Sequence, residues 1–259
     1  MVGGGDAPRD FGQAGQPRMN GWQPLKHHLM GPPQPAALVA LFHGLGGSLS
    51  ELRPAAERWA AALPRTAFLF LQAPDRDYFE RELKSGAFSG DWYKFPLLRS
   101  AYGDNAKAEA AYARMVHRCI NERCEHVSAE LDRHLAELSL GNDRLMLAGF
   151  SQGAAISAYT GLRRRCLGIL PLGGPCPPRP ALMPSNDVTR VCAIVGDADH
   201  CAPHEEIRAS FSKYPGARMD SSTGVHVIPN QEHVVSEASI ALGLAFLRGC
   251  LRAAKVKER

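Results

Sequence analysis

Ser151 is the residue of this chain whose neighbours point most directly to chemistry. It lies between two glycines in Gly149-Phe150-Ser151-Gln152-Gly153, which matches the pattern G-x-S-x-G. Between a strand and a helix, this pattern forms a sharp turn that lifts a nucleophilic serine above the edge of a sheet. Five-residue patterns also occur by chance, and the alternative is an ordinary glycine-flanked turn. The partner residues and the flanking elements decide between the two.

A serine hydroxyl is a poor nucleophile until a base accepts its proton. Two histidines are candidates for that base, and both follow Ser151 in the chain. His226 lies inside the apolar run 224–229, where a strand would direct its side chain toward one face of the sheet, whereas His233 lies in the loop after that run. We therefore expect His233 to be the general base.

The base in turn needs a carboxylate to orient it, and the expected chain order is serine, acid, histidine. Asp197 and Asp199 both follow the apolar run 190–196, in the required place between Ser151 and His233. The residue pattern alone leaves both aspartates open, and the one that is not catalytic is free to cap the turn.

A glycine-rich stretch, Phe42 to Ser48 with the sequence FHGLGGS, follows an early apolar run. Glycines in such a loop allow backbone N–H groups to face the negative oxygen that forms during acyl transfer. We expect the N–H groups of Leu45 and Gln152 to form this oxyanion hole. A plain tight turn is the alternative, and a phosphate-binding loop is disfavoured because its lysine and hydroxyl spacing are missing.

Metal binding is a rival interpretation of the region after 190–196. Asp199, His200, Cys201 and His204 are all capable zinc ligands. Neighbouring residues rarely converge on one ion, and no second ligand cluster is visible in the sequence. We therefore expect no metal site and no cofactor.

The elements that must position these residues follow from the alternation of short apolar runs with longer helical patterns. This alternation predicts a mostly parallel central sheet with helices on both faces. The expected strands are 36–42, 66–72, 144–150, 167–174, 190–196 and 224–229. The expected helices are 51–62, 105–140 with a break left open near Arg123, one after Ser151 that Ala154, Ala155, Ile156 and Ala158 open, and 236–252. The strand-turn-helix context that Ser151 requires is thus predicted.

Two segments depart from this rhythm. Residues 1–20 are rich in Gly, Pro and Gln, and we expect them to lack fixed structure. Residues 73–104 combine prolines, glycines and aromatics, and we expect them to form a loop excursion near the active site. The rest, 21–254, is expected to form a single domain.

Composition limits the classes of partner. The 259 residues are 45% hydrophobic and carry a net charge of +4 that is spread along the chain, so nucleic acid is not an expected partner. No signal peptide and no integral membrane segment are visible, and the seven cysteines are odd in number without C-x-x-C spacing. We expect a cytoplasmic protein with reduced thiols.

Several stretches together resemble the carboxylesterase, lysophospholipase and acyl-protein thioesterase family of α/β-hydrolases. They are LFHGLGG, FLQAP, GDWYKF, LAGFSQGAA, VGDADHCAP and EHVVSEASIALGLAFL, between about Pro35 and Leu251. The resemblance places the acid on Asp199 and the base on His233, and it implies that Trp92, followed by Tyr93, lines the acyl pocket. His200-Cys201 departs from the smaller or apolar residues that are frequent there.

The sequence therefore predicts a serine hydrolase of the α/β-hydrolase fold that cleaves ester or thioester bonds of small to medium or fatty acyl substrates. Ser151, Asp199 and His233 would form its triad. The expected substrate is a small-molecule ester or an acylated protein or lipid, and the sequence leaves monomer and homodimer open. A non-catalytic binder on the same fold is the alternative from another class.

Overall fold

One sheet organises the part of the chain that the computed structural model describes, which is residues 23–74, 92, 106–175, 189–212 and 224–255, with side chains left out for 106–117. The sheet has seven strands in the order β1-β3-β2-β4-β5-β6-β7. The strands are β1 His27–Met30, β2 Ala37–Phe42, β3 Thr66–Leu71, β4 Leu145–Phe150, β5 Gly168–Leu172, β6 Arg190–Gly196 and β7 Gly224–Ile228. All neighbours are parallel except β1 and β3.

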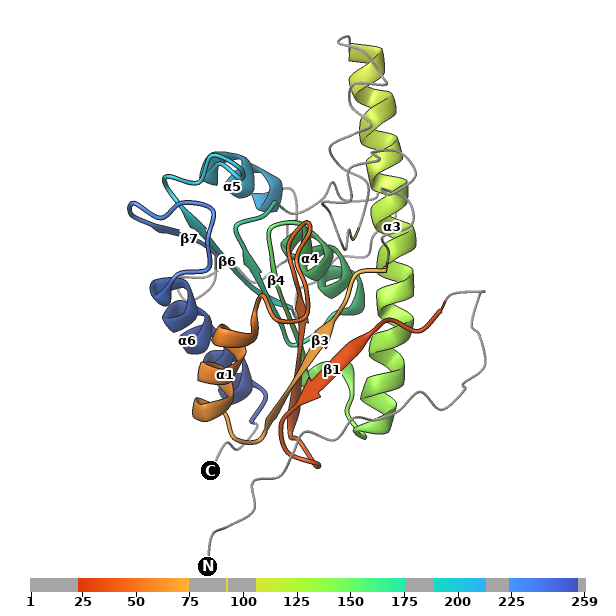
Figure 1. The fold of residues 1–259 in the computed structure, drawn as a ribbon, viewed down its shortest axis with the longest axis vertical. Helices are drawn as coiled ribbons and strands as arrows, with labels where there is room; N and C mark the ends of the chain where they lie inside the picture. The colour runs from red at the N-terminus through yellow and green to blue at the C-terminus, as the bar shows by residue number, and fades with distance from the viewer. Residues whose placement is uncertain (1–22, 75–91, 93–105, 176–188, 213–223, 256–259) are drawn as a thin grey trace, which may run out of the picture.

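Helices cover both faces of the sheet, and a hydrophobic cluster lies under each layer (Figure 1). The helices α1 Arg53–Ala62 and α6 Glu237–Ala253 lie on one face. The long helix α3 Ala106–Glu137, with α4 Gln152–Arg164 and α5 His204–Ser212, lies on the other. Every residue of β2 and β3 is buried, as their continuous apolar sequence predicts for strands covered on both sides.

The predicted elements are found with small changes at their ends, and the structure adds a strand, β1, and an α-helix, α5, that were not predicted. The edge strand β1 was not predicted, because its sequence HHLM is short and carries no apolar run or alternation. The break that the sequence left open near Arg123 is absent, since α3 is one continuous helix of 32 residues. The upper part of α3 rises beyond the sheet in Figure 1. The predicted segments 1–20 and 73–104 lie almost wholly outside the described residues.

The parallel strands bring several distant loops to one edge of the sheet. Phe42 is paired with Gly149, Phe150 with Leu172, and Gly196 with Ile228, while Leu172 is paired with Ile194. The carboxyl ends of these five neighbouring strands therefore lie at the same edge of the sheet. Loops at the carboxyl ends of such strands form the usual ligand-binding crevice of open α/β sheets. Each stretch singled out in the sequence for chemistry follows one of these strand ends.

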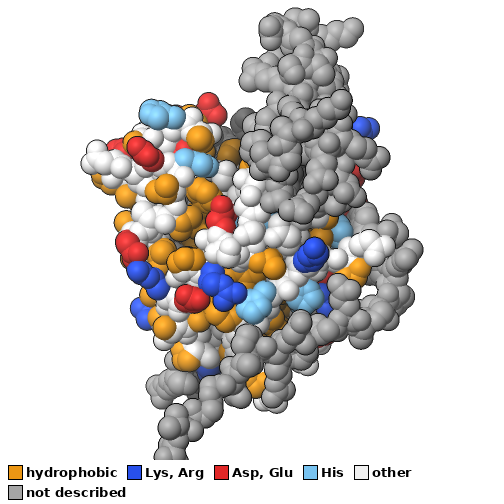
Figure 2. Space-filling model, in the orientation of Figure 1, with side chains coloured by type: hydrophobic (Ala, Val, Ile, Leu, Met, Phe, Trp, Pro, Cys, Tyr) orange, Lys and Arg blue, Asp and Glu red, His pale blue; other side chains and the backbone are white. Residues whose placement is uncertain are grey.

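Figure 2 shows the molecule in the orientation of Figure 1. On the face seen there, hydrophobic, basic and acidic side chains of the described residues are interspersed. Within the described ranges, no helix is long and apolar enough to cross a membrane.

Candidate active site

Ser151 occupies a strained turn between β4 and α4. Its backbone has φ 53° and ψ −116°, which L side chains rarely adopt. Only glycine fits at the two flanking positions. A Cβ on Gly149 would lie 2.1 Å from the carbonyl oxygen of Gly153, and a Cβ on Gly153 would lie 2.2 Å from the carbonyl oxygen of Phe42. The G-x-S-x-G pattern is therefore required by sterics here.

A chain of hydrogen bonds connects Ser151 with two residues far away in the sequence. The Oγ of Ser151 lies 2.9 Å from Nε2 of His233, whose Nδ1 lies 2.8 Å from Oδ2 of Asp199. Because an ionised carboxylate only accepts hydrogen bonds, Nδ1 carries the ring proton and Nε2 is left to accept one from Ser151. This is the geometry that activates a serine for nucleophilic attack.

Asp199 is buried, and its environment satisfies both of its oxygens. While Oδ2 accepts from His233, Oδ1 accepts from the backbone N–H groups of Cys201 at 3.0 Å and Ala202 at 2.8 Å. The Asp199 side chain is 1% exposed and that of His233 is 23% exposed. The carboxylate is therefore fixed in the protein, while the imidazole remains accessible to a substrate.

The alternative candidates for the acid and the base, Asp197 and His226, lie elsewhere. Asp197 accepts a hydrogen bond from the backbone N–H of Asn230 at 2.6 Å, and so joins the turns that follow β6 and β7. His226 lies within β7, as predicted, where it is paired with Ile194 and lines a cavity against α6. Asp197 and His226 therefore lie outside the hydrogen-bonded chain of Ser151, His233 and Asp199.

The four residues considered as zinc ligands do not come together as a group. His204 lies 3.2 Å from Glu205 through Nε2. Among the described residues, Asp199 and Cys201 instead place a ligand atom each within 4.8 Å of one on His233. His200 is exposed and is not part of this group.

The loop of Leu45 lies beside Ser151, on the side away from the acid. An added Cβ at Gly44 would come within 3.3 Å of the Cβ of Ser151, which shows how closely this loop approaches. Gln152 is the first residue of α4, where backbone N–H groups point out of the helix end. Gly44, which precedes Leu45, thus lies close to Ser151; that the N–H groups of Leu45 and Gln152 face an oxyanion stays a prediction.

Glu51 holds this loop, and no motif in the sequence identified it. Its Oε2 accepts a hydrogen bond from the backbone N–H of Gly44 at 2.5 Å, and its carboxylate also packs closely against Gly47. Burial raises the pKa of the Glu51 carboxyl, while the Gly44 N–H and His233 oppose that rise. A glutamate eight residues after His43 gives no signal by spacing alone.

His43 and Gln72 fix the other side of the same loop. The Nδ1 of His43 donates to the carbonyl oxygen of Gly44 at 2.7 Å, and its Nε2 accepts from the backbone N–H of Ala73 at 3.0 Å. Gln72 lies 2.9 Å from the same Nε2 and accepts from the backbone N–H of Leu49. Burial lowers the pKa of His43, so the neutral form is favoured.

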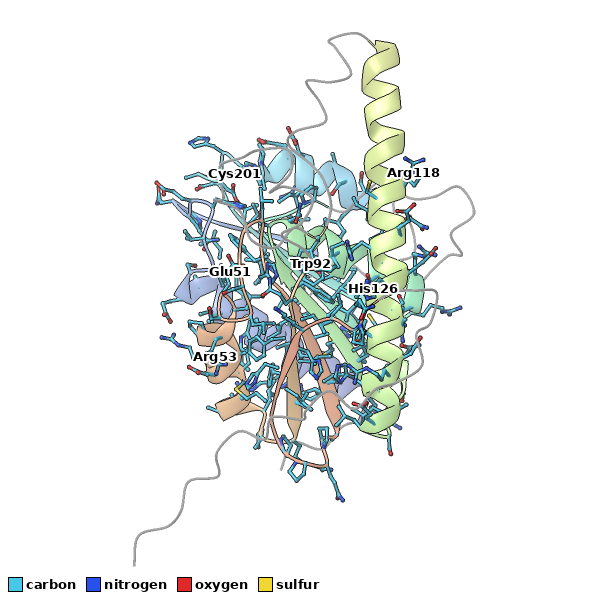
Figure 3. The ribbon with its side chains drawn as sticks, turned by 45° about the vertical axis from the view of Figure 1, so that its right-hand side comes forward. Glu51, Arg53, Trp92, Arg118, His126 and Cys201 are labelled. Atoms are coloured by element: carbon cyan, nitrogen blue, oxygen red, sulfur yellow. The ribbon has the colours of Figure 1, made fainter. Side chains whose placement is uncertain are left out.

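Trp92 supports the site from the side of α3 (Figure 3). Its side chain is fully buried, its indole N–H donates to the carbonyl oxygen of His43 at 2.8 Å, and its backbone N–H donates to the Gln152 side chain at 2.8 Å. Its ring also packs against Phe42. That Trp92 contacts an acyl chain stays a prediction, and Tyr93 lies outside the described residues.

Comparisons with known proteins agree with this architecture. A family model described as phospholipase/carboxylesterase matches residues 30–251. Acyl-protein thioesterase 1 of Mycosarcoma maydis is 26% identical over 227 residues, which cover 83% of this chain and 91% of that protein. The structure of esterase PE8 has a TM-score of 0.68 at 24% identity, covering 88% of this chain and all of that one, and the Bacillus cereus carboxylesterase has 0.64 at 16%, covering 87% and 94%. The predicted α/β-hydrolase fold is confirmed.

Proposed function

We propose that this chain cleaves acyl esters or thioesters through an acyl-enzyme on Ser151. The chain belongs to the phospholipase/carboxylesterase family and is a hydrolase of the esterase and thioesterase type. The observation that carries the proposal is the hydrogen-bonded chain from Ser151 through His233 to the buried Asp199. A strained turn that presents the serine at the carboxyl edge of the sheet supports it.

In the first half of the reaction, Oγ of Ser151 attacks the carbonyl carbon and Nε2 of His233 accepts the hydroxyl proton. Asp199 keeps the proton on Nδ1 and stabilises the imidazolium that forms. The backbone N–H groups of Leu45 and Gln152 stabilise the negative carbonyl oxygen. His233 then gives its proton to the departing alcohol or thiol, and the acyl group remains on Ser151.

In the second half, a water molecule takes the place of the leaving group. His233 accepts a proton from this water, whose oxygen attacks the acyl carbon, and the same N–H groups stabilise the second oxyanion. Collapse of this intermediate breaks the bond to Ser151, which recovers its proton from His233. The products are a carboxylic acid and the free enzyme.

Glu51 has a positioning role in this scheme. The oxyanion hole depends on backbone N–H groups, so its geometry depends on whatever holds the loop of Gly44 and Leu45. Glu51 binds the N–H of Gly44, and His43 binds its carbonyl oxygen. Together they fix the peptide groups on both sides of Gly44, and thereby the direction of the next N–H.

The substrate class follows from the relatives by analogy and from the family resemblance. The matched relative is named for thioester cleavage on acylated proteins, whereas the matched structures include esterases. We propose that both oxoesters and thioesters with small to medium or fatty acyl chains are substrates. Because each buried methylene contributes about 0.8 kcal/mol, kcat/KM should rise about threefold to fourfold per methylene until the acyl site is full.

A series of oxoesters and thioesters from acetyl to long acyl chains tests the proposal, together with a fluorophosphonate probe on the wild type and Ser151→Ala. We expect covalent labelling that is lost in Ser151→Ala. Turnover and labelling that persist in this variant would place the nucleophile elsewhere. No turnover of any ester would favour the non-catalytic binder. A chain-length profile unchanged in Trp92→Ala would remove Trp92 from the acyl site.

A further inference from the structure

Cys201 is a thiol beside the proposed active site that the hydrolytic mechanism does not use. It lies two residues after Asp199, in the loop that follows β6, and it is exposed (Figure 3). Its backbone N–H donates to Asp199, and its side chain has no part in the proposed reaction.

The other described cysteines differ from Cys201 in burial. Burial raises the pKa of four thiols to about 12, so they are poor ligands at neutral pH; these are Cys124, Cys166, Cys192 and Cys250. Cys119, on α3, is half-buried. Among the described cysteines, Cys201 is therefore the one that is both exposed and next to other ligand-forming side chains.

Three kinds of zinc-binding side chain meet at this point. A carboxylate oxygen of Asp199, the thiol sulfur of Cys201 and a ring nitrogen of His233 all lie within 4.8 Å of one another. Zinc–ligand bonds of about 2.0–2.3 Å hold the donor atoms of a tetrahedral site roughly 3.3–3.8 Å apart. Rotation of the exposed Cys201 side chain, with a small movement of His233 away from Asp199, from which its Nδ1 now lies 2.8 Å, would bring the three donor atoms to these separations.

We propose that Asp199, Cys201 and His233 form an inhibitory site for a thiophilic divalent cation such as Zn²⁺. The inference rests on the proposed function for its consequence, since the cation occupies the base of the triad. It does not require Ser151 for binding. The fourth position on the metal stays open to water, as in other three-ligand zinc sites.

Binding and catalysis exclude each other at His233. In the resting site one ring nitrogen bonds to Asp199 and the other to Ser151. A cation that takes either nitrogen breaks one of these bonds and prevents His233 from accepting the serine proton.

Zn²⁺ inhibition of ester hydrolysis, measured without any His tag or thiol reductant, tests the consequence. We expect Cys201→Ser to need at least about tenfold more Zn²⁺ for half-inhibition, relative to its own uninhibited rate. Cys119→Ser is the matched control and should respond as the wild type does. Mg²⁺ should not inhibit, because it prefers oxygen ligands, and a chelator should restore activity.

Cobalt spectroscopy tests the site itself, whatever the nucleophile is. Co²⁺ should give a thiolate-to-metal charge-transfer band in the wild type and in Ser151→Ala, and the band should be absent in Cys201→Ser. A band in Ser151→Ala but no loss of labelling there would contradict the proposed function and leave the metal site standing. Equal Zn²⁺ sensitivity of Cys201→Ser and wild type, or no band in an active wild type, would overturn the metal site.

Discussion

The two sides of Ser151 are held in different ways. On the acid–base side, two hydrogen bonds link three side chains, and each of them takes part in proton transfer or orientation. On the oxyanion side, the proposed stabilising groups are backbone N–H groups, and the loop that carries them is held by Glu51, His43 and Trp92. The first arrangement can be removed by one substitution, whereas the second is distributed over several supports and should weaken gradually.

The largest decrease in kcat is expected on the acid–base side, for substitution of His233. His233→Ala should lower kcat by about 10⁴ to 10⁶, as losses of triad residues do in serine proteases. His226→Gln is the matched control and should keep most of the activity, because His226 lies in β7 against α6. Steady-state kinetics with circular dichroism checks both, and the reverse ranking would contradict the assignment of the base.

The two aspartates give the next largest contrast. Asp199→Asn should lower kcat by about 10⁴, because an amide can hold His233 in the wrong tautomer and does not stabilise the imidazolium. Asp197→Asn should stay close to the wild-type rate, since the amide oxygen can still accept from the backbone of Asn230. Similar losses in both variants would leave the acid unassigned.

Glu51 probes the oxyanion side, where a smaller effect is expected. Glu51→Ala removes the acceptor for the Gly44 N–H and should lower kcat by up to about 10². This decrease is no larger than the decrease in kcat caused by removing one oxyanion-hole donor. KM should change little, because the ground-state carbonyl depends less on the hole than the oxyanion does.

Glu51→Gln is the conservative control for this prediction. Its amide oxygen can still accept from Gly44, so it should recover most of the activity lost in Glu51→Ala. Because glutamine does not titrate, any part of the pH profile that follows the raised pKa of Glu51 should be absent from Glu51→Gln. A rate equal to that of the wild type in Glu51→Ala would show that His43 and Gln72 suffice to hold the loop.

The smallest effect concerns the stability that His43 gives to the same loop. Burial lowers its pKa below the ordinary value of about 6.5, so its contribution is complete above that pH and is lost as the pH falls through the lowered pKa. His43→Gln should cost about 1–3 kcal/mol at pH 7.5 through unpaired backbone groups. It should also flatten the loss of stability between pH 7.5 and 4.

Urea unfolding at several pH values measures this difference. The buried His126 and His134, whose pKa values are also lowered by burial, in the case of His134 to about 3, remain in both proteins. Some acid destabilisation should therefore persist in His43→Gln. If the free energy of unfolding changed with pH in the same way in the wild type and in His43→Gln, this would contradict the prediction that a neutral His43 stabilises the loop.

Much of the fold could be predicted because the inner strands are apolar along their whole length. β2, β3 and β4 read as uninterrupted runs, and the glycines around Ser151 mark a turn that only small residues permit. β1 escaped prediction because its pairing with β3, rather than its own composition, makes it a strand. The sequence left open a break in α3 near Arg123, because local pattern does not register the packing that continues the helix.

The sequence by itself determined the strand-turn-helix around Ser151 and the order of candidate partners, because periodicity and glycine sterics are local properties. Position along the chain already favoured His233 over His226, whereas the residue pattern left Asp197 and Asp199 open. Only the tertiary structure shows that Asp199 bonds to His233 while Asp197 bonds to the backbone of Asn230. The tertiary structure also shows which residues hold the loop of Gly44 and Leu45. Glu51, Gln72 and Trp92 belong to separate segments, and a hydrogen bond between distant segments exists only once the sheet has brought them to one edge.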